Sequence, residues 1–224
     1  MSSKGALPDP VAIDGPAASG KSTIGRALAE RFGYHFLDTG LMYRAFTLAA
    51  LERGVAPDAA ACEALADGLR LDVEAGLETR IRIDGADITG RLREPEVEAN
   101  VSRYAALVPV REALVKLQRE IASRGMAVLA GRDIGTVVLP RAPLKIYLDA
   151  SEEARALRRS VQAGRAAGEA PHTRAQIARR DEMDSTRATA PLAAAADAII
   201  VDTTAMTLAE VIAVVLEQIE CARN

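Results

Sequence analysis

A glycine-rich segment near the N-terminus has the residue types and spacing of a phosphate-binding loop. Gly15–Ser22 reads GPAASGKS and fits the pattern G-x-x-x-x-G-K-[ST] without mismatch. The glycines let the backbone curl closely around phosphates and point its N–H groups inward. Lys21 is expected to reach the β- and γ-phosphates, and Ser22 to offer its hydroxyl to Mg²⁺. The motif predicts ATP or GTP binding but leaves open a kinase, a hydrolase or a switch.

The predicted nucleotide-binding set covers the whole loop and the start of the helix after it. Its expected ATP-binding members are Gly15, Pro16, Ala17, Ala18, Ser19, Gly20, Lys21, Ser22 and Thr23, and Ser22 is the expected metal ligand.

A second feature is an arginine-rich segment in the C-terminal third. Eight arginines and four acidic residues lie between Arg155 and Arg187. Arg155, Arg158 and Arg159 have the spacing of one helical face, and Gly164–Gly168 interrupts two expected helices as a hinged tip. The segment is either a lid that closes cations over a triphosphate or a solvated helical hairpin.

The composition narrows the classes of function. Of the 28 basic residues four are lysine and the rest arginine, which suits bidentate phosphate binding but also fits a codon bias toward arginine. A net charge of −3 and 3% aromatic residues disfavour a nucleic-acid partner. Hydrophobic residues at 49% and charged residues at 26% are typical of a globular protein.

The cysteines and histidines predict no zinc site, no disulfide framework and no general base. Cys62 and Cys221 lack metal-ligand spacing, and His35 and His172 lack sequence partners. Met1–Pro10 is polar, and no apolar stretch reaches the length of a membrane span. We therefore expect a cytoplasmic protein with no membrane partner.

The phosphate loop has the strand before it and the helix after it that its chemistry requires. Val11–Ile13 predicts a buried strand, and the apolar spacing from Lys21 to Phe32 predicts a helix closed by Gly33. Further strands are expected at Tyr34–Leu37, Ala127–Ala130, Leu144–Leu148 and Ala198–Val201. Strands that alternate with helices predict a parallel sheet covered on both faces.

Other local signals place the remaining elements. Thr39 is expected to cap a helix that runs to about Arg53, and Ser151 to cap another. Residues 70–90 alternate around Asp84-Gly85, which predicts a small antiparallel sheet. Pro95 and Pro109 suit first turns of helices, and Thr173-x-x-Gln176 and Thr207-x-x-Glu210 read as capping boxes.

Several separate motifs, in order, resemble those of the bacterial cytidylate kinases over nearly the whole chain. They are IDGPAASGKS at Ile13–Ser22, DTGLMYR at Asp38–Arg44, GRDIGT at Gly131–Thr136 and RDEMDSTRATAPL at Arg180–Leu192. Two further stretches, ITGRLREPEV at Ile88–Val97 and VSRYAALVPVREAL at Val101–Leu114, also resemble this family.

The resemblance implies an α/β fold: a three-layer α/β/α P-loop kinase with a five-stranded parallel core sheet, a small antiparallel insertion and a helical lid. The expected single domain comprises a core (about 8–55, 110–150 and 190–224), a monophosphate-binding insertion (about 56–109) and a lid (about 155–187). The implied reaction moves the γ-phosphate of ATP to CMP or dCMP by direct in-line, Mg²⁺-assisted transfer. A monomer is expected, because lid closure completes the site within one chain.

The resemblance also implies roles for individual residues. Arg44, Arg132 and Arg187 would grip the acceptor phosphate, with Thr39 in the same wall. Ser102, Arg111 and Asp133 would read the cytosine edge, and Arg180 with Asp184 would hold the sugar hydroxyls. The implied catalytic set is Lys21, Arg132, Arg155, Arg159 and Arg187.

The residue chemistry agrees with these roles and leaves alternatives. Cytosine presents an amine where uracil has a carbonyl, so Asp133 can accept from it, or it can serve as a structural partner of Arg132 or another cation. Arg180 and Asp184 have the i, i+4 spacing of a plain helical salt bridge. Ala130 departs from the family, in which many members carry an acid there; Asp14 could supply that acid, or it is dispensable.

Three other functions remain open on sequence grounds. The chain could phosphorylate UMP or a small metabolite such as shikimate, it could be an ATP-controlled binding switch, or it could be a nucleic-acid-processing ATPase. The base-reading trio argues against the first. A second set of phosphate-gripping arginines argues against the switch, and the scarcity of aromatic residues argues against the ATPase.

Overall fold

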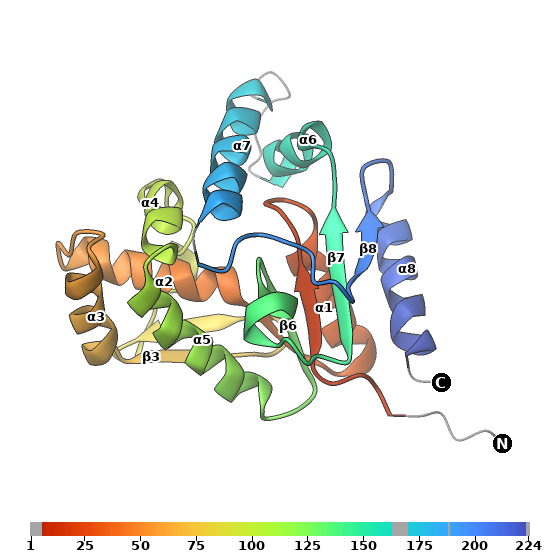
Figure 1. Ribbon diagram of the computed structural model, residues 1–224, viewed down its shortest axis with the longest axis horizontal. Coiled ribbons are helices and arrows are strands. Elements are labelled where there is room, and N and C mark those ends of the chain that lie inside the picture. Colours follow the sequence, from red (N-terminus) through yellow and green to blue (C-terminus); the bar gives the residue numbers. More distant parts are fainter. Residues whose placement is uncertain (1–5, 163–169, 188, 223–224) are drawn as a thin grey trace.

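The computed structural model describes residues 6–162, 170–187 and 189–222. Within these residues, five parallel strands form the central sheet in the order β2-β6-β1-β7-β8 (Figure 1). Their bounds are β1 (Val11–Asp14), β2 (His35–Asp38), β6 (Ala127–Gly131), β7 (Leu144–Asp149) and β8 (Ile199–Asp202). The prediction of a parallel α/β sheet is confirmed, with strand ends shifted by one or two residues.

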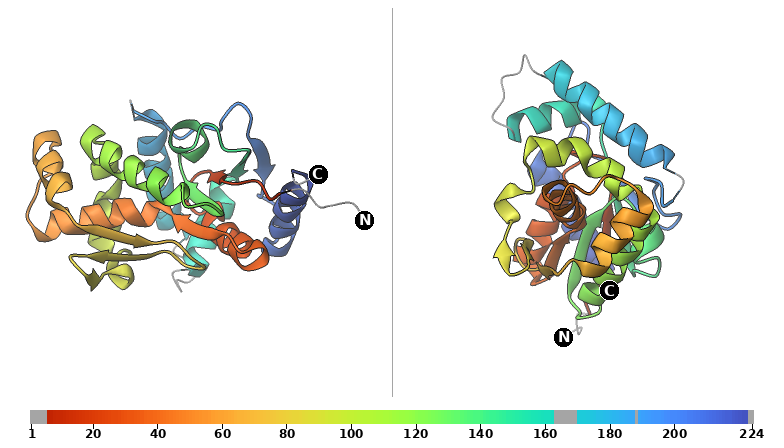
Figure 2. Two further views of the ribbon diagram at one scale, coloured as in Figure 1. Left: turned by 90° about the horizontal axis from the view of Figure 1, so that it is seen from below. Right: turned by 90° about the vertical axis from the view of Figure 1, so that its left-hand side faces the viewer.

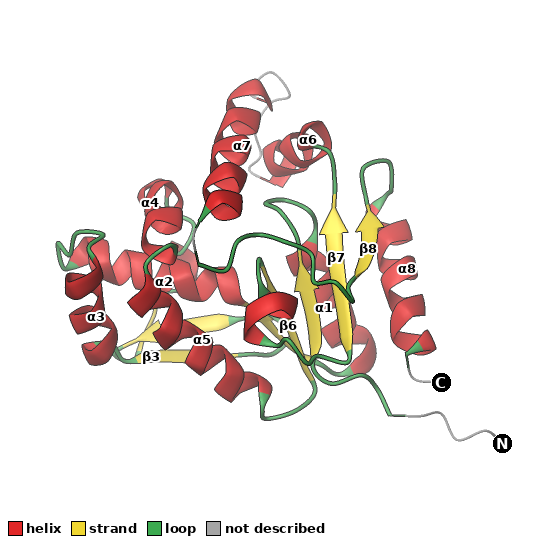
Figure 3. Ribbon diagram, in the orientation of Figure 1, coloured by secondary structure: helices red, strands yellow, loops and turns green. Residues whose placement is uncertain are grey.

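Alternate residues of the strands face opposite layers of helices. Val11 and Ile13 pack in one apolar cluster with α1 (Lys21–Phe32) and α8 (Leu208–Cys221). Ala12 belongs to the other cluster, which α2 (Thr39–Glu52) and α5 (Val108–Ala122) help to form. Because strand side chains alternate, this division produces the three layers seen in Figure 3. No helix in the described part of the chain is both long and apolar enough to cross a bilayer.

A second, antiparallel sheet lies beside the core, as the alternation around Asp84-Gly85 predicted. It consists of β3 (Leu71–Glu74), β4 (Arg80–Ile83) and β5 (Ala86–Asp87). Both turn residues have positive φ, 50° at Asp84 and 85° at Gly85. The same region contributes α3 (Ala59–Gly68), the short 3₁₀ helix η1 (Thr89–Arg91) and α4 (Pro95–Ala105). The first view of Figure 2 shows these elements at one end of the molecule.

Two helices lie over the carboxyl ends of the central strands (Figure 1). They are α6 (Glu152–Gln162) and α7 (Ala170–Thr186), which pack side by side. The Ser151 hydroxyl caps α6 as predicted, accepting from the Ala154 amide at 3.2 Å. The expected hinged tip, Gly164–Gly168 with Arg165, lies outside the described residues.

Two predicted helix starts are wrong, and the one at Thr207 is confirmed like that at Ser151. Asp38, not Thr39, caps α2 by accepting from the Gly40 amide, because the Thr39 hydroxyl is instead drawn to a carbonyl of β6. Helix α7 begins three residues before Thr173, since Pro171 is well suited to a first turn. The Thr207–Glu210 capping box of α8 is formed in both directions.

We expect Gly15→Ala to destabilise the fold strongly. Gly15 has φ +147°, and a Cβ there would lie 2.1 Å from the Leu148 carbonyl oxygen, so backbone would have to move. The expected loss in free energy of unfolding is about 3 kcal/mol or more. Gly68→Ala is the control, because its Cβ would enter open space on α3. Urea unfolding followed by circular dichroism measures both, and equal midpoints for the two variants would contradict the prediction.

Candidate active site

The chemistry-bearing residues gather at the carboxyl ends of the central strands. The phosphate loop follows β1, Asp38 ends β2, and Arg132 and Asp133 follow β6. Helix α6, which carries Arg155 and Arg159, follows β7. In a parallel sheet these ends share one edge, which is the usual place for a ligand.

The phosphate loop turns sharply and folds its lysine back over itself. Gly20 has φ +100° and Ala18 has φ +58°. The Lys21 ammonium donates to the Pro16 carbonyl at 2.6 Å and to the Ser19 hydroxyl at 3.3 Å. Burial, followed by the nearby Arg132, lowers the pKa of Lys21 well below its usual value. This loop therefore holds a desolvated cation that gains from a phosphate beside it.

The metal-ligand candidate Ser22 faces a carboxylate. Its hydroxyl donates to Asp38 Oδ2 at 2.8 Å. In the sheet register Asp38 lies directly beside Ala130, the position where the sequence departs from the resembled family. Asp38 was not predicted as a site residue, because its contact with Ser22 depends on the neighbouring strand.

Asp14 holds the loop that follows β6. Its two carboxylate oxygens accept from the amides of Ile134 and Gly135, each at 2.7 Å. Burial raises the pKa of Asp14 to about 6, although both amide bonds oppose the shift. The Asp14 carboxylate therefore holds the first two residues of the π-helical turn η2 (Ile134–Val138). This turn directly follows Arg132 and Asp133, so Asp14 helps to position them.

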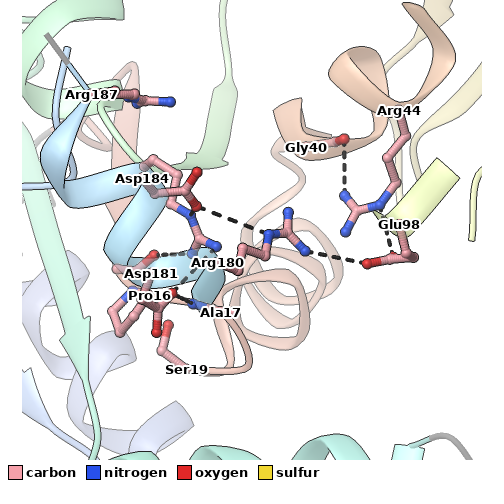
Figure 4. Close-up of polar contacts among 12 residues, drawn as sticks. Pro16, Ala17, Ser19, Gly40, Arg44, Glu98, Arg180, Asp181, Asp184 and Arg187 are labelled. Carbon is pink, nitrogen blue, oxygen red and sulfur yellow. Dashed lines mark hydrogen bonds and ion pairs between the residues drawn. The ribbon is translucent and has the colours of Figure 1, made fainter. Parts of the chain in front are cut away.

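Asp181 of α7 reaches the phosphate loop and is a residue that the sequence reasoning missed. Its Oδ1 accepts from the Ala17 amide at 3.1 Å (Figure 4). Its Oδ2 pairs with Arg155. Arg132 lies 3.8 Å from the same carboxylate. The Asp181 carboxylate therefore occupies an anion position formed by an amide of the phosphate loop and two arginines.

Glu98 of α4 is the second missed residue. It accepts from Arg44 Nε at 3.0 Å and pairs with Arg159 and Arg180 at 3.3 Å each. Figure 4 shows its carboxylate between Arg44 and Arg180. Burial raises the pKa of Glu98, but Arg44, Arg180 and Arg159 outweigh it and lower the pKa to about 2. Sequence offered no signal, because the four side chains come from four different helices.

Arg132 joins the phosphate loop to the lid. It donates to the Gly15 carbonyl and to Asp184 Oδ2, both at 2.8 Å. Asp184 is only loosely paired with Arg180, at 4.0 Å, so the plain i, i+4 salt bridge is the weaker of its two contacts. Burial opposes ionisation of Asp184, but Arg132 and Arg180 keep its pKa below the usual value.

Two of the predicted base-reading residues, Arg111 and Asp133, are buried and in contact. Asp133 accepts from Arg111 and lies 3.6 Å from Arg187, so its partners are these two cations. The Arg111 guanidinium lies over the Tyr43 ring, 5.7 Å from its centroid. Ser102 lies on α4, one helical turn after Glu98.

Several buried polar atoms on the elements that carry Arg111, Asp133 and their neighbours have no hydrogen-bond partner among the described residues. They are the Tyr43 hydroxyl, the Thr136 hydroxyl, both amide atoms of Gln118, Arg111 Nη1 and Arg187 Nη2. Buried polar groups are normally satisfied, so this group indicates the place of a polar ligand. Sequence reasoning missed Tyr43 and Gln118.

Other predicted features lie apart from the site. Arg158 bonds to Thr203, Arg174 pairs with Glu152 and Glu153 at the surface, and Arg179 is exposed. His35 is exposed at the start of β2, and the side chain of His172 is not among those described. A surface hollow of about 510 Å³ between β3 and the end of α5 contains none of the predicted site residues in its lining.

Comparison with known proteins gives one consistent family. The sequence model described as "Cytidylate kinase" matches residues 11–221. A cytidylate kinase of Limosilactobacillus fermentum is 46% identical over 215 residues, which cover 94% of this chain and 95% of that protein. One from Mycobacterium avium is 48% identical over 207 residues, with 90% and 91% covered. Among solved structures, a gluconokinase from Sinorhizobium meliloti aligns at 17% identity and a TM-score of 0.48, covering 97% of this chain and 94% of that one.

We expect Glu98 to make stability depend on acidity. Its pKa of about 2 in the fold lies below the ordinary value of 4.5, so it stabilises the fold fully above about pH 4.5. That contribution, on the order of 1–3 kcal/mol, is lost as the pH falls from 4.5 toward 2. In Glu98→Gln the free energy of unfolding should fall less between pH 5 and pH 3 than in the wild type.

Glu96→Gln is the matched control for this experiment, since Glu96 lies on the same helix and is exposed. Denaturant unfolding across the pH series measures all three proteins. Parallel curves for wild type and Glu98→Gln would show that Glu98 titrates alike in the folded and unfolded chain.

Proposed function

The chain belongs to the cytidylate kinase family, and on that premise we propose how its own residues move the γ-phosphate of ATP to CMP or dCMP. One observation carries the proposal. Two carboxylates of the chain are each paired with arginines. Asp181 is paired at the phosphate loop, and Glu98 is paired on α4, below α6 and α7. Reaction between two nucleotides requires two such anion positions side by side.

The first position is the donor site. The loop amides would bind the ATP phosphates, and Lys21 would leave the Pro16 carbonyl for the β- and γ-oxygens. Arg155, which already reaches the Ala17 carbonyl, would follow the γ-phosphate when ATP replaces the Asp181 carboxylate. Burial of Lys21 strengthens its attraction to the phosphates.

The oxygens near Ser22 fit Mg²⁺. Mg²⁺ prefers oxygen ligands and is usually held by one or two protein groups together with substrate phosphates. The Ser22 hydroxyl and the Asp38 carboxylate, 2.8 Å apart, supply that chemistry, and the described residues contain no larger cluster of metal ligands. Asp38 is a better candidate than Asp14, which is committed to two amides. Bound Mg²⁺ would neutralise the donor phosphates.

The second position is the acceptor phosphate site. Arg44 would hold the acceptor phosphate from one side, and Arg132 and Arg187 from the other. Thr39 is turned away toward the Ala130 carbonyl, so it would contribute to the wall rather than a direct bond. Arg180 and Asp184, which face the same space from α7, would hold the sugar.

The base would enter the pocket of unsatisfied polar atoms. Asp133 would accept from the exocyclic amine of cytosine, while Arg111 and Ser102 would donate to N3 and O2. Uracil would set a carbonyl against Asp133 and leave buried groups unpaired. Preference for cytosine follows from that mismatch.

Transfer needs little covalent help. The acceptor oxygen is already anionic, so the chemistry requires in-line placement and neutralisation of charge rather than a general base. Lys21, Arg132, Arg155 and Arg159 would stabilise charge on the moving phosphoryl group.

We also propose the extent of the core, insertion and lid, the oligomeric state of the enzyme and its cellular location. The core (about 8–55, 110–150 and 190–224) carries the donor site, the insertion (about 56–109) covers the acceptor, and the lid (about 155–187) supplies Arg155 and Arg159. All these groups come from one chain, which supports a monomer. The proposed place of action is the cytoplasm, on free nucleotides. Size-exclusion chromatography with light scattering tests the monomer directly.

We expect Asp133→Ala to abolish discrimination between cytosine and uracil. ADP release is followed with ATP·Mg²⁺ and each of CMP, dCMP, UMP and AMP. The wild type should use CMP and dCMP quickly and UMP slowly. The variant should lose about 10²–10⁴-fold in kcat/KM with CMP and far less with UMP, because only CMP loses a matched hydrogen bond. Equal losses with both acceptors would remove Asp133 from base reading.

We expect Ser22→Ala to raise the Mg²⁺ concentration needed for half-maximal rate by about tenfold, because one oxygen ligand is lost. Ser123→Ala, at the exposed end of α5, is the control. Excess EDTA should stop the wild-type reaction. An unchanged Mg²⁺ requirement in Ser22→Ala would place the ion elsewhere.

A further inference from the structure

Glu98 is the one carboxylate that Arg44 and Arg159 share among the described residues. Glu98 Oε1 contacts both of them, and its Oε2 contacts Arg180. Two oxygens thus serve three guanidinium groups from α2, α6 and α7. Because Glu98 itself belongs to α4, the contact also joins the insertion to the lid.

The cations around Glu98 outnumber its charge. Burial lowers the pKa of Arg93, and the nearby Arg44 and Arg159 lower it further, while Asp38 and Glu98 oppose the shift. Burial, with Arg44 and Arg132, lowers the pKa of Arg180 to about 10. Like charges held this close repel, and one monovalent carboxylate compensates them only in part. The arrangement is better matched to an anion of higher charge.

A phosphate monoester fits this requirement better than Glu98 does. It carries up to two negative charges and three terminal oxygens, so it can bind Arg44 together with the other arginines of the acceptor phosphate site. Arg44 is buried and also anchored to the Gly40 carbonyl at 3.0 Å, so the arginine is in place before any ligand arrives. Glu98 thus has the position and partners of a phosphate but a weaker charge.

Resting on the proposed function, we infer that Glu98 is a specificity-determining residue that competes with the acceptor's phosphate for Arg44, while it also holds Arg159 and Arg180 in the empty site. In the empty site its carboxylate compensates the three arginines. A phosphorylated acceptor replaces Glu98, and its phosphate, which carries more negative charge, then compensates the positive charge of the arginines. A neutral nucleoside offers no such exchange, since displacing Glu98 would leave the buried Arg44 without an anionic partner.

The competition has a measurable cost in affinity. Only molecules in which Glu98 has left the arginines can bind the phosphate, so the apparent dissociation constant is raised by the inverse of that fraction. Removal of the Glu98 charge should make the site permanently available. The gain must be confined to ligands that bring a phosphate, because only these bind Arg44 through a phosphate oxygen.

The experiment measures dissociation constants by calorimetry for CMP, cytidine and inorganic phosphate with wild type, Glu98→Gln and Glu96→Gln. Glu98→Gln should bind CMP and inorganic phosphate about tenfold more tightly than wild type, with cytidine unchanged. Glu96→Gln removes a charge from the same helix at an exposed position and should match the wild type. Weaker or equal CMP binding in Glu98→Gln overturns the inference, as does an equal gain for cytidine.

A second readout applies if the Gln variant is unstable. Millimolar inorganic phosphate should raise the Tm of Glu98→Gln by several degrees more than that of wild type, because phosphate then supplies the missing charge. Glu98→Asp retains the charge but shortens the reach and should respond between the two. Equal Tm shifts in all three proteins would contradict competition. If wild type binds no CMP, the proposed function fails, whereas the phosphate measurements still decide the role of Glu98.

Discussion

Mutual repulsion among the arginines that a phosphoryl-transfer site needs is the constraint on which the rest of this structure depends. Guanidinium groups placed to hold two nucleotides lie close together before either nucleotide is bound. The chain balances them with acids from other elements: Glu98 with Arg44, Arg159 and Arg180, and Asp133 with Arg111 and Arg187. Such partly buried pairs hold geometry while adding little net stability. They can therefore be exchanged for phosphates.

That balance also distinguishes the lid from the core. Helices α2 and α5 are fixed by apolar clusters shared with the sheet. Helix α7 is attached to the phosphate loop and to α4 mainly through Asp181, Asp184 and Arg180, with Ile177 as a buried apolar contact. Ionic contacts respond to a bound anion, whereas apolar packing does not. The ionic contacts of α7 can therefore respond to a bound anion without disturbing the apolar packing of the core.

Local sequence signals predicted the phosphate loop, the parallel sheet and the Thr207–Glu210 capping box because each depends on neighbouring residues. They failed where a distant group decides. Thr39 could not cap its helix because a carbonyl of β6 takes its hydroxyl. Glu98 and Asp181 had no signal, since their partners lie 54 and 164 residues away in the contacts with Arg44 and Ala17. Helix α3 and the π-helical turn η2 were missed as well, the latter because it is held by Asp14 across the sheet.

When the protein's own carboxylates occupy the site, it binds phosphate less tightly, but its arginine side chains are better ordered. An open cluster of buried arginines would bind phosphate more tightly, but repulsion would spread the side chains and each binding event would have to gather them again. With Glu98 in place, Arg44 stays against the Gly40 carbonyl, and Arg159 and Arg180 stay paired with Glu98. The incoming phosphate then meets donors that are already in position. Displacing Glu98 costs free energy, but the arginine side chains lose less conformational entropy on binding. Preorganisation of this kind favours the arrangement needed for transfer over the tightest hold on the substrate.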